Sequence, residues 1–284
     1  MRAGLAPAVT GARVEAVTVF DERCLRRHEG PAEDFVDRMA GAVLAAPRRR
    51  GKFLWNPAET ESAHPEALLV HLGMSGQVLL RERAAELGRL TRARLDIHSP
   101  EHGPLRLDFV DQRLFGSLAL DRLTPAADAP DELIPAQAAH IARDPLDELF
   151  DERRFFTALA RRRTTVKRAL LDQTLLSGVG NIYADEALWA ARIHYDQPTE
   201  TLSRAKARTL LAELRAVLGK ALAEGGTSFD SQYLNVNGQA GYFAHSLNAY
   251  GRQGEPCPRC GTPIVREVFM NRGSHFCPKC QRVR

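Results

Sequence analysis

Short runs of alternating apolar and polar residues fill the first half of the chain, and this period of two is typical of half-buried β-strands. Residues 13–20, R-V-E-A-V-T-V-F, show it most clearly. Further strand candidates, separated by Gly, Pro or charged residues, are 52–55, 68–72, 77–80, 93–97, 105–109 and 116–120. One helix is expected at about 32–44. The pattern favours an antiparallel β-sandwich with flanking helices.

The second half has the longer period of amphipathic helices, which we expect at 151–162, 166–173, 182–192 and 204–224. In the last helix, apolar residues from Leu210 to Leu222 fall on one face, Ser203 is a suitable N-cap and Gly225 ends the helix. In the third helix, Asp185 and Glu186 lie in the first turns, where acids suit the helix dipole. The fold class is therefore α+β.

A chain of 284 residues is long enough for about two domains. We expect a β-sandwich domain at 1–122, a connector rich in Pro, Ala and Asp at 123–146, and a helical domain at 147–250. A C-terminal ribbon follows at 251–284. The longest apolar runs are far too short to span a bilayer, so no membrane partner is expected.

Four cysteines near the C-terminus carry the most specific pattern: Cys257 and Cys260 in C-P-R-C, then Cys277 and Cys280 in C-P-K-C. Two close pairs separated by a hairpin-length insert predict one structural Zn²⁺ ion. The alternative is two disulfides, which a reducing compartment disfavours; no signal peptide is seen, so we expect a cytoplasmic protein. The fifth cysteine, Cys24, is expected to be a buried or incidental thiol.

Positive charge is unevenly placed along the chain, whose formal net charge is +4. Residues 251–284 hold six Arg and one Lys against two Glu, and a second basic stretch covers 151–170. The two segments could form one face for a polyanion, or they could be two ordinary solvated surfaces. Arg272, between the cysteine pairs, should lie near a hairpin tip, which favours a nucleic-acid partner.

Taken in order, these elements resemble the formamidopyrimidine-DNA glycosylase family of bacterial base-excision repair enzymes. The resemblance covers nearly the whole chain. The carrying motifs are R-R-G-K-F-L-W (49–55), H-L-G-M-S-G (71–76), D-Q-R-L-F-G (111–116), L-L-D-Q-T-L-L-S-G-V-G-N-I-Y-A-D-E-A-L-W (170–189), G-G-T-S-F (225–229), N-G-Q-A-G-Y-F (237–243), Y-G-R-Q-G-E-P-C (250–257) and the cysteine ribbon.

The resemblance implies a monomeric, nucleoid-associated enzyme that acts on damaged double-stranded DNA. Its helical domain would be a helix–two-turn–helix domain, with a lid loop at 227–242 over the flipped base. The reaction would be glycosylase and abasic-site lyase chemistry on oxidised purines, through base flipping, a Schiff base and β/δ-elimination. The filling residues and the long lid favour 8-oxoguanine and formamidopyrimidines over the oxidised pyrimidines of the endonuclease VIII branch.

The resemblance also implies two catalytic side chains. Lys52 matches a strand lysine that contacts phosphate and helps in proton transfer, although by itself it reads as an ordinary surface lysine. Arg272 matches the ribbon-tip arginine that acts in δ-elimination. Because arginine hardly deprotonates, we expect Arg272 to act mainly through its charge on a phosphate.

Seven further residues match DNA-binding positions of the family. Met74, Arg113 and Phe115 would fill the space left by the flipped nucleotide; core packing is the alternative for Met74 and Phe115, but their glycine-rich settings favour exposure. The phosphate contacts would come from Arg92, Arg162, Lys167 and Asn181. We expect Asn181 to cap the third helix, and Arg92 stands where many members have histidine.

One departure concerns the start of the chain. Members of the family begin P-E-L-P-E-V-E, with the proline amine as nucleophile and the adjacent glutamate as proton carrier, whereas this sequence begins M-R-A-G-L. Either the start codon has been assigned too far downstream, which we favour, or the segment is lost. In the second case the protein would be a catalytically impaired, damaged-DNA-binding zinc protein. A zinc-ribbon transcription factor would leave the first half unexplained.

Overall fold

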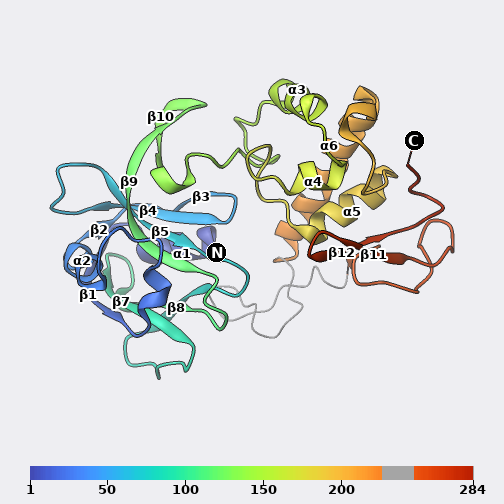
Figure 1. Ribbon diagram of the computed structural model, residues 1–284. Coiled ribbons are helices and arrows are strands. Elements are labelled where there is room, and N and C mark those ends of the chain that lie inside the picture. The colour runs from blue at the N-terminus through green and yellow to red at the C-terminus, as the bar shows by residue number, and fades with distance from the viewer. Residues whose placement is uncertain (226–245, 284) are drawn as a thin grey trace. The chain divides into compact units, whose positions relative to one another are not determined.

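The computed structural model describes residues 1–225 and 246–283. The chain divides into two compact units, which we call the N-terminal unit (1–140) and the C-terminal unit (141–225 and 246–283) within the described residues (Figure 1). The lid loop expected at 227–242 lies outside the described residues.

The N-terminal unit is built on an antiparallel sheet with the order β10-β9-β5-β4-β2-β1-β7-β8-β6, in which β3 also pairs with β4. The strands are β1 (Ala12–Val19), β2 (Val43–Leu44), β3 (Arg48–Arg50), β4 (Phe53–Glu59), β5 (Glu66–His71), β6 (Gln77–Glu82), β7 (Thr91–Ser99), β8 (Gly103–Val110), β9 (Ser117–Ala126) and β10 (Ala129–Pro135). Their buried side chains share one core with helices α1 (Arg2–Val9) and α2 (Ala32–Met39). The expected antiparallel β-fold with flanking helices is confirmed.

Helix α2 ends five residues earlier than the sequence predicted. Ala40 takes an extended conformation and Gly41 has a φ of +83°, which a side chain would strain. The backbone can therefore turn, and Val43 and Leu44 pair with β1 instead of continuing the helix.

The segment expected as a connector from residue 123 contains ordered strands. It holds the end of β9, all of β10 and the short 3-10 helix η2 (Ala136–Ala138). Strand β10 lies at the edge of the sheet, where a proline costs no ladder hydrogen bond, so its Pro130 and Pro135 misled the sequence interpretation. Leu123 and Ile134 are buried, which anchors the hairpin to the sheet.

The C-terminal unit contains the predicted helices and ribbon: α3 (Glu152–Arg161), α4 (Val166–Leu171), α5 (Asn181–Ala191), α6 (Arg204–Ala223), β11 (Val265–Phe269) and β12 (Arg272–Phe276). Two short 3-10 helices complete the assignment, η1 (Glu22–Leu25) in the N-terminal unit and η3 (Thr199–Thr201) here. The Ser203 Oγ accepts a hydrogen bond from the Lys206 amide at 3.3 Å, which confirms the predicted cap of α6.

Helices and ribbon of this unit share a core. Phe269 and Phe276 of the ribbon are buried in the same apolar cluster as the inward faces of α3 to α6. The ribbon is thus attached to the helices by burial as well as by polar contacts. Among the described helices, none combines the length and apolar character needed to cross a bilayer.

Candidate nucleic-acid interface and metal centre

Two turns of the N-terminal unit present exposed side chains. Met74, between β5 and β6, is 50% exposed, and Phe115, between β8 and β9, is 45% exposed. The exposure predicted from their glycine-rich settings is confirmed. A Cβ atom on Gly73 would lie 2.5 Å from the carbonyl carbon and oxygen of Phe115, so the backbones of the two turns touch. The structure therefore brings the two side-chain positions together.

Asp111 ties the two turns to each other. Its side chain is fully buried, and its Oδ1 accepts from the Ser75 hydroxyl at 2.5 Å and from the Arg113 amide at 3.1 Å. Its Oδ2 accepts from the Gly116 amide at 2.6 Å. The sequence analysis missed this role, although an aspartate two residues before an expected binding residue is typical of a side chain that closes an Asx turn.

The Phe115 turn is held in an uncommon backbone conformation. Leu114 has a φ of +54°, in the left-handed region that branched residues rarely occupy. The Arg26 guanidinium donates hydrogen bonds to the carbonyls of both Leu114 and Phe115, which fixes this conformation. The Arg113 guanidinium lies 5.5 Å from the centroid of the Phe115 ring, within range of a cation–π contact.

Lys52 lies in a turn and not in a strand as predicted. Arg50 pairs with Phe53, so Gly51 and Lys52 form a two-residue connection between β3 and β4, which the φ of +57° at Gly51 permits. Lys52 is exposed, whereas Trp55 beyond it is fully buried. The aromatic residues that follow Lys52 therefore do not shield it from solvent.

Arg92 has partners within its own unit. Its Nε donates to the Asp111 carbonyl at 2.8 Å, and its Nη1 lies 3.5 Å from an Asp21 carboxylate oxygen. Its side chain is only 19% exposed. The guanidinium expected to bind phosphate thus supports the backbone at Asp111.

His71 stands at the end of β5, close to the Met74 turn. Burial, with smaller contributions from the positive charges of Arg27, Lys52 and Arg26, lowers the pKa of His71 to about 4. Its ring centroid lies 4.7 Å from that of Phe53. His71 is therefore a neutral residue at physiological pH.

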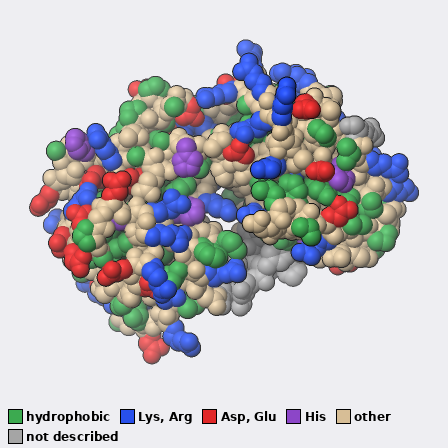
Figure 2. Space-filling model, in the orientation of Figure 1, with side chains coloured by type: hydrophobic (Ala, Val, Ile, Leu, Met, Phe, Trp, Pro, Cys, Tyr) green, Lys and Arg blue, Asp and Glu red, His purple; other side chains and the backbone are tan. Residues whose placement is uncertain are grey.

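In the C-terminal unit, Arg272 opens β12 directly after the two-residue turn Met270–Asn271, so its predicted place near the hairpin tip is confirmed. Arg162 and Arg272 line one hollow. Arg162 also pairs with Asp172. Helix α3 carries much of the basic stretch 151–170. Figure 2 shows Lys and Arg side chains gathered over this helix, at the top of the view.

Lys167, expected to contact phosphate, has no exposed surface. Its ammonium lies 2.7 Å from Asp185 Oδ1, donates to the Gly273 carbonyl at 3.3 Å and sits 5.0 Å from the Phe269 ring centroid. The structure corrects this prediction, because α4 turns Lys167 towards the ribbon and not towards solvent. The residue holds the ribbon in place beside Arg272.

Asn181 is the first residue of α5, and the N-cap is Gly180 without a side-chain hydrogen bond. The capping role predicted for Asn181 is therefore wrong. Its Nδ2 instead donates to the Gly273 carbonyl at 3.0 Å, the same oxygen that Lys167 contacts. The ribbon backbone next to Arg272 is thus held from α4 and from α5.

The acids predicted to suit the α5 dipole are buried anchors. Asp185, 1% exposed, accepts from the Ser274 hydroxyl at 3.1 Å and from the His275 amide at 2.8 Å. Glu186, 2% exposed, accepts from the backbone amides of residues 248, 249 and 250 at 2.8–2.9 Å. Sequence position alone did not reveal this, because their partners lie more than sixty residues away.

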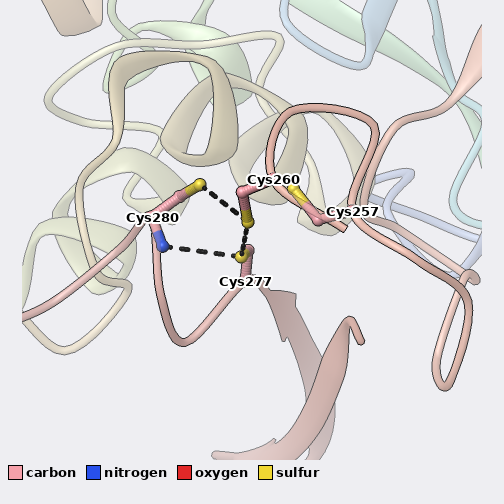
Figure 3. A group of neighbouring side chains, drawn as sticks. All are labelled: Cys257, Cys260, Cys277 and Cys280. Carbon is pink, nitrogen blue, oxygen red and sulfur yellow. Dashed lines mark hydrogen bonds between the residues drawn. The ribbon is translucent and has the colours of Figure 1, made fainter. Parts of the chain in front are cut away.

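The four ribbon cysteines converge on one point (Figure 3). Their sulfurs all lie within 4.8 Å of one another, and the Cys260 sulfur is 3.5 Å from those of Cys277 and Cys280. A tetrahedral zinc ion with bonds of about 2.3 Å places sulfurs about 3.8 Å apart. None of the four forms a disulfide. The donor set fits zinc.

Neighbouring donors favour the thiolate form that zinc requires at Cys257 and Cys260, whereas burial raises the pKa of Cys277 and Cys280 before zinc binds. The Trp189 indole donates to the Cys257 sulfur at 3.4 Å, and the hydroxyl and amide of Thr262 lower the pKa of Cys260 to about 6. Cys24 differs: it is fully buried, and burial raises its pKa to about 12, as expected for an inert thiol.

Three family models match the chain in the order of its parts. Residues 1–118 match the formamidopyrimidine-DNA glycosylase N-terminal domain, and 141–232 match the formamidopyrimidine-DNA glycosylase H2TH domain. Residues 254–283 match a zinc finger found in FPG and IleRS. The chain belongs to the formamidopyrimidine-DNA glycosylase family. The family's zinc finger and the four converging sulfurs together assign one structural zinc ion to the ribbon.

Relatives in this family match along nearly their whole lengths. The formamidopyrimidine-DNA glycosylase of Leifsonia xyli is 61% identical over 100% of this chain and 97% of its own length. That of Thermobifida fusca is 54% identical over 99% and 94%. A solved complex of Lactococcus lactis Fpg with abasic-site DNA superimposes with a TM-score of 0.81 at 28% identity, covering 99% of this chain and 96% of that one.

Proposed function

We propose that the protein is a base-excision repair glycosylase and abasic-site lyase that removes oxidised purines, above all 8-oxoguanine and formamidopyrimidines, from double-stranded DNA. The observation that carries the proposal is the pair of turns joined through Asp111. They present a flexible thioether, an aromatic ring and a guanidinium at one place. An enzyme that extrudes a nucleotide needs such side chains to occupy the space it leaves.

Each of the three side chains has a role in this proposal. Phe115 inserts between base pairs, Met74 fills the vacated position, and Arg113 hydrogen-bonds the unpaired partner base, preferably cytosine. Because Leu114 is held in its left-handed conformation by Arg26, the insertion of Phe115 requires little reordering of the turn.

The phosphate contacts come from the C-terminal unit. Arg272 binds the backbone near the flipped nucleotide, with Arg162 and Asn181 on neighbouring phosphates, while zinc keeps the ribbon rigid. Lys52, on its exposed turn, serves proton transfer. We place the protein at the bacterial nucleoid, in the cytoplasm, as a monomer. Solved Lactococcus lactis Fpg complexes with abasic-site and Fapy-dG DNA support this substrate class.

Binding and catalysis need separate tests, because the proline and glutamate of the family do not occur at the start of this sequence. The first test compares a duplex holding one tetrahydrofuran abasic-site analogue with the same duplex undamaged. We expect preference for the damaged duplex of about tenfold or more, and loss of that preference in Phe115→Ala. Equal affinity for both duplexes would contradict the proposal.

The second test traps the Schiff base with borohydride on an 8-oxoguanine duplex. We expect little adduct from the chain beginning at Met1 and a strong adduct from a chain in which P-E-L-P-E-V-E precedes it. If the extended chain prefers the abasic duplex but forms no adduct, the protein is a damaged-DNA-binding protein and the glycosylase proposal is wrong.

A further inference from the structure

A hollow of about 450 Å³ in the C-terminal unit is lined by more positively charged than negatively charged side chains. Its charged lining consists of Arg162, Arg168 and Arg272 against the single carboxylate of Asp172. That carboxylate is already paired with Arg162, which also donates to the Thr174 hydroxyl at 3.3 Å. Two guanidiniums are left without a counter-charge in the hollow.

Arg168 belongs to the basic stretch 151–170. It lies on α4 and is exposed, next to the buried Lys167. Within residues 1–225 and 246–283, its guanidinium has no hydrogen bond or ion pair, and the same holds for Arg272. Such unpaired cations in one concavity attract an anion, since focusing by the walls strengthens their field.

The remaining lining favours a phosphodiester with its sugar over a free inorganic anion. Met270 at the ribbon tip is 58% exposed and, with Leu171, gives the hollow an apolar wall. Met270, which has a φ of +53°, and Arg272 flank Asn271 at the ribbon tip, and both line the hollow. Arg168, which lies on α4 and precedes Arg272 by 104 positions, also lines the hollow.

We propose that Arg168 binds a second phosphodiester of the damaged strand in this hollow, next to the phosphate bound by Arg272. The inference rests on the proposed function and adds a residue to it. Arg162 contributes less here, because Asp172 already offsets its charge. Arg168 and Arg272 then act as two separate phosphate contacts, each releasing counterions from the DNA when it binds.

The test compares Arg168→Gln with Arg163→Gln, which removes the same charge from an exposed residue outside the hollow. Affinity for the abasic-analogue duplex is measured from 50 to 400 mM KCl. We expect Arg168→Gln to weaken binding about three- to tenfold at 100 mM and to reduce the salt slope by about one, with the slope unchanged in Arg163→Gln. Equal slopes and affinities in the two variants would overturn the inference.

A methylphosphonate scan of the damaged strand locates the contact. At one position, removing the phosphate charge should weaken binding by the parent chain and leave Arg168→Gln unaffected. If every position weakens both proteins alike, Arg168 contacts no defined phosphate and the inference is wrong. Failure of the proposed function looks different, because the parent chain itself would then not distinguish the abasic duplex from the undamaged one.

Discussion

The turns that carry Met74 and Phe115 and the ribbon tip that carries Arg272 both rest on a buried aspartate, but the two carboxylates are balanced differently. Asp111 receives hydrogen bonds from one hydroxyl and two backbone amides, and no described cation pairs with its carboxylate. Asp185 receives similar hydrogen bonds and also pairs with the buried Lys167 at 2.7 Å.

The difference follows from what each aspartate has to hold. Asp111 closes its own turn and reaches a neighbouring turn 36 residues away, so neutral donors are sufficient. Asp185 holds a ribbon that follows it by about 90 residues and has only two strands of its own. An isolated hairpin is marginally stable, so the ribbon depends on zinc, on its buried phenylalanines and on this ion pair.

The largest effect should come from the metal. Cys277→Ser removes one zinc ligand, and structural zinc contributes about 10 kcal/mol or more to the folding of such small modules. We expect loss of bound zinc, fast hydrogen exchange in β11 and β12, and at least about a hundredfold weaker binding to the abasic duplex. Exchange in the N-terminal unit should stay unchanged. Cys24→Ser is the control, and retained affinity in the zinc-free variant would show that the ribbon does not position Arg272.

The next effect should come from the buried ion pair. Asp185→Asn leaves the Lys167 ammonium without its counter-charge, which costs about 3–5 kcal/mol in the C-terminal unit. Chemical denaturation and hydrogen exchange in β12 measure it. The double variant Lys167→Met with Asp185→Asn should recover most of the loss, since it removes both charges and keeps a side-chain oxygen that accepts from the ribbon donors. A loss in the double variant as large as in the single one would contradict the role of charge and indicate packing instead.

Substitution of Asp111 should reduce stability less than substitution of Asp185, and should mainly change the conformation of the two turns that carry Met74 and Phe115. In Asp111→Asn an amide NH₂ replaces one carboxylate oxygen and faces an N–H or O–H donor, at a cost of about 1–3 kcal/mol. We expect the preference for abasic over undamaged duplex to fall about tenfold, while binding to undamaged DNA and its salt slope hardly change. The matched control is Gln112→Ala, an exposed neighbour in the same turn. Equal losses on both duplexes would contradict a specific role for the turn.

The features that could be predicted from the sequence are those that depend on residues close together in the chain. The cysteine spacing, the helix periods and the exposure of Met74 and Phe115 follow from residues a few positions apart. The burial of Lys167 does not, because its partner oxygens on Asp185 and Gly273 become neighbours only in the folded unit. The match of Lys167 to a DNA-binding position of the family therefore led us to expect a phosphate contact at the surface. Pro130 similarly led us to miss β10. A strand tolerates proline where it lies at the edge of a sheet, and no local pattern reveals that β10 is an edge strand.

The smallest effect should come from lowering the pH, which should destabilise β5 next to the Met74 turn through His71. The pKa of His71 is about 4 in the folded protein, against about 6.5 in an unfolded chain. Above pH 6.5 both states hold a neutral ring, and its contribution to stability is fully present. As the pH falls from 6.5 towards 4, the unfolded chain binds a proton that the folded one does not, so stability is lost.

His71→Gln removes this proton uptake and keeps a polar side chain near Arg26, Arg27 and Lys52. Between pH 7 and pH 5 we expect the parent chain to lose about 1–2 kcal/mol more than the variant in the opening free energy of β5, measured by hydrogen exchange. This figure is below the full shift because His71 is partly exposed and solvent screens its charge. Exchange in β12, held by Asp185 and Lys167, should have the same pH dependence in both proteins. If the opening free energy of β5 has the same pH dependence in the parent chain and in His71→Gln, then carboxylates, and not His71, make this unit sensitive to acid.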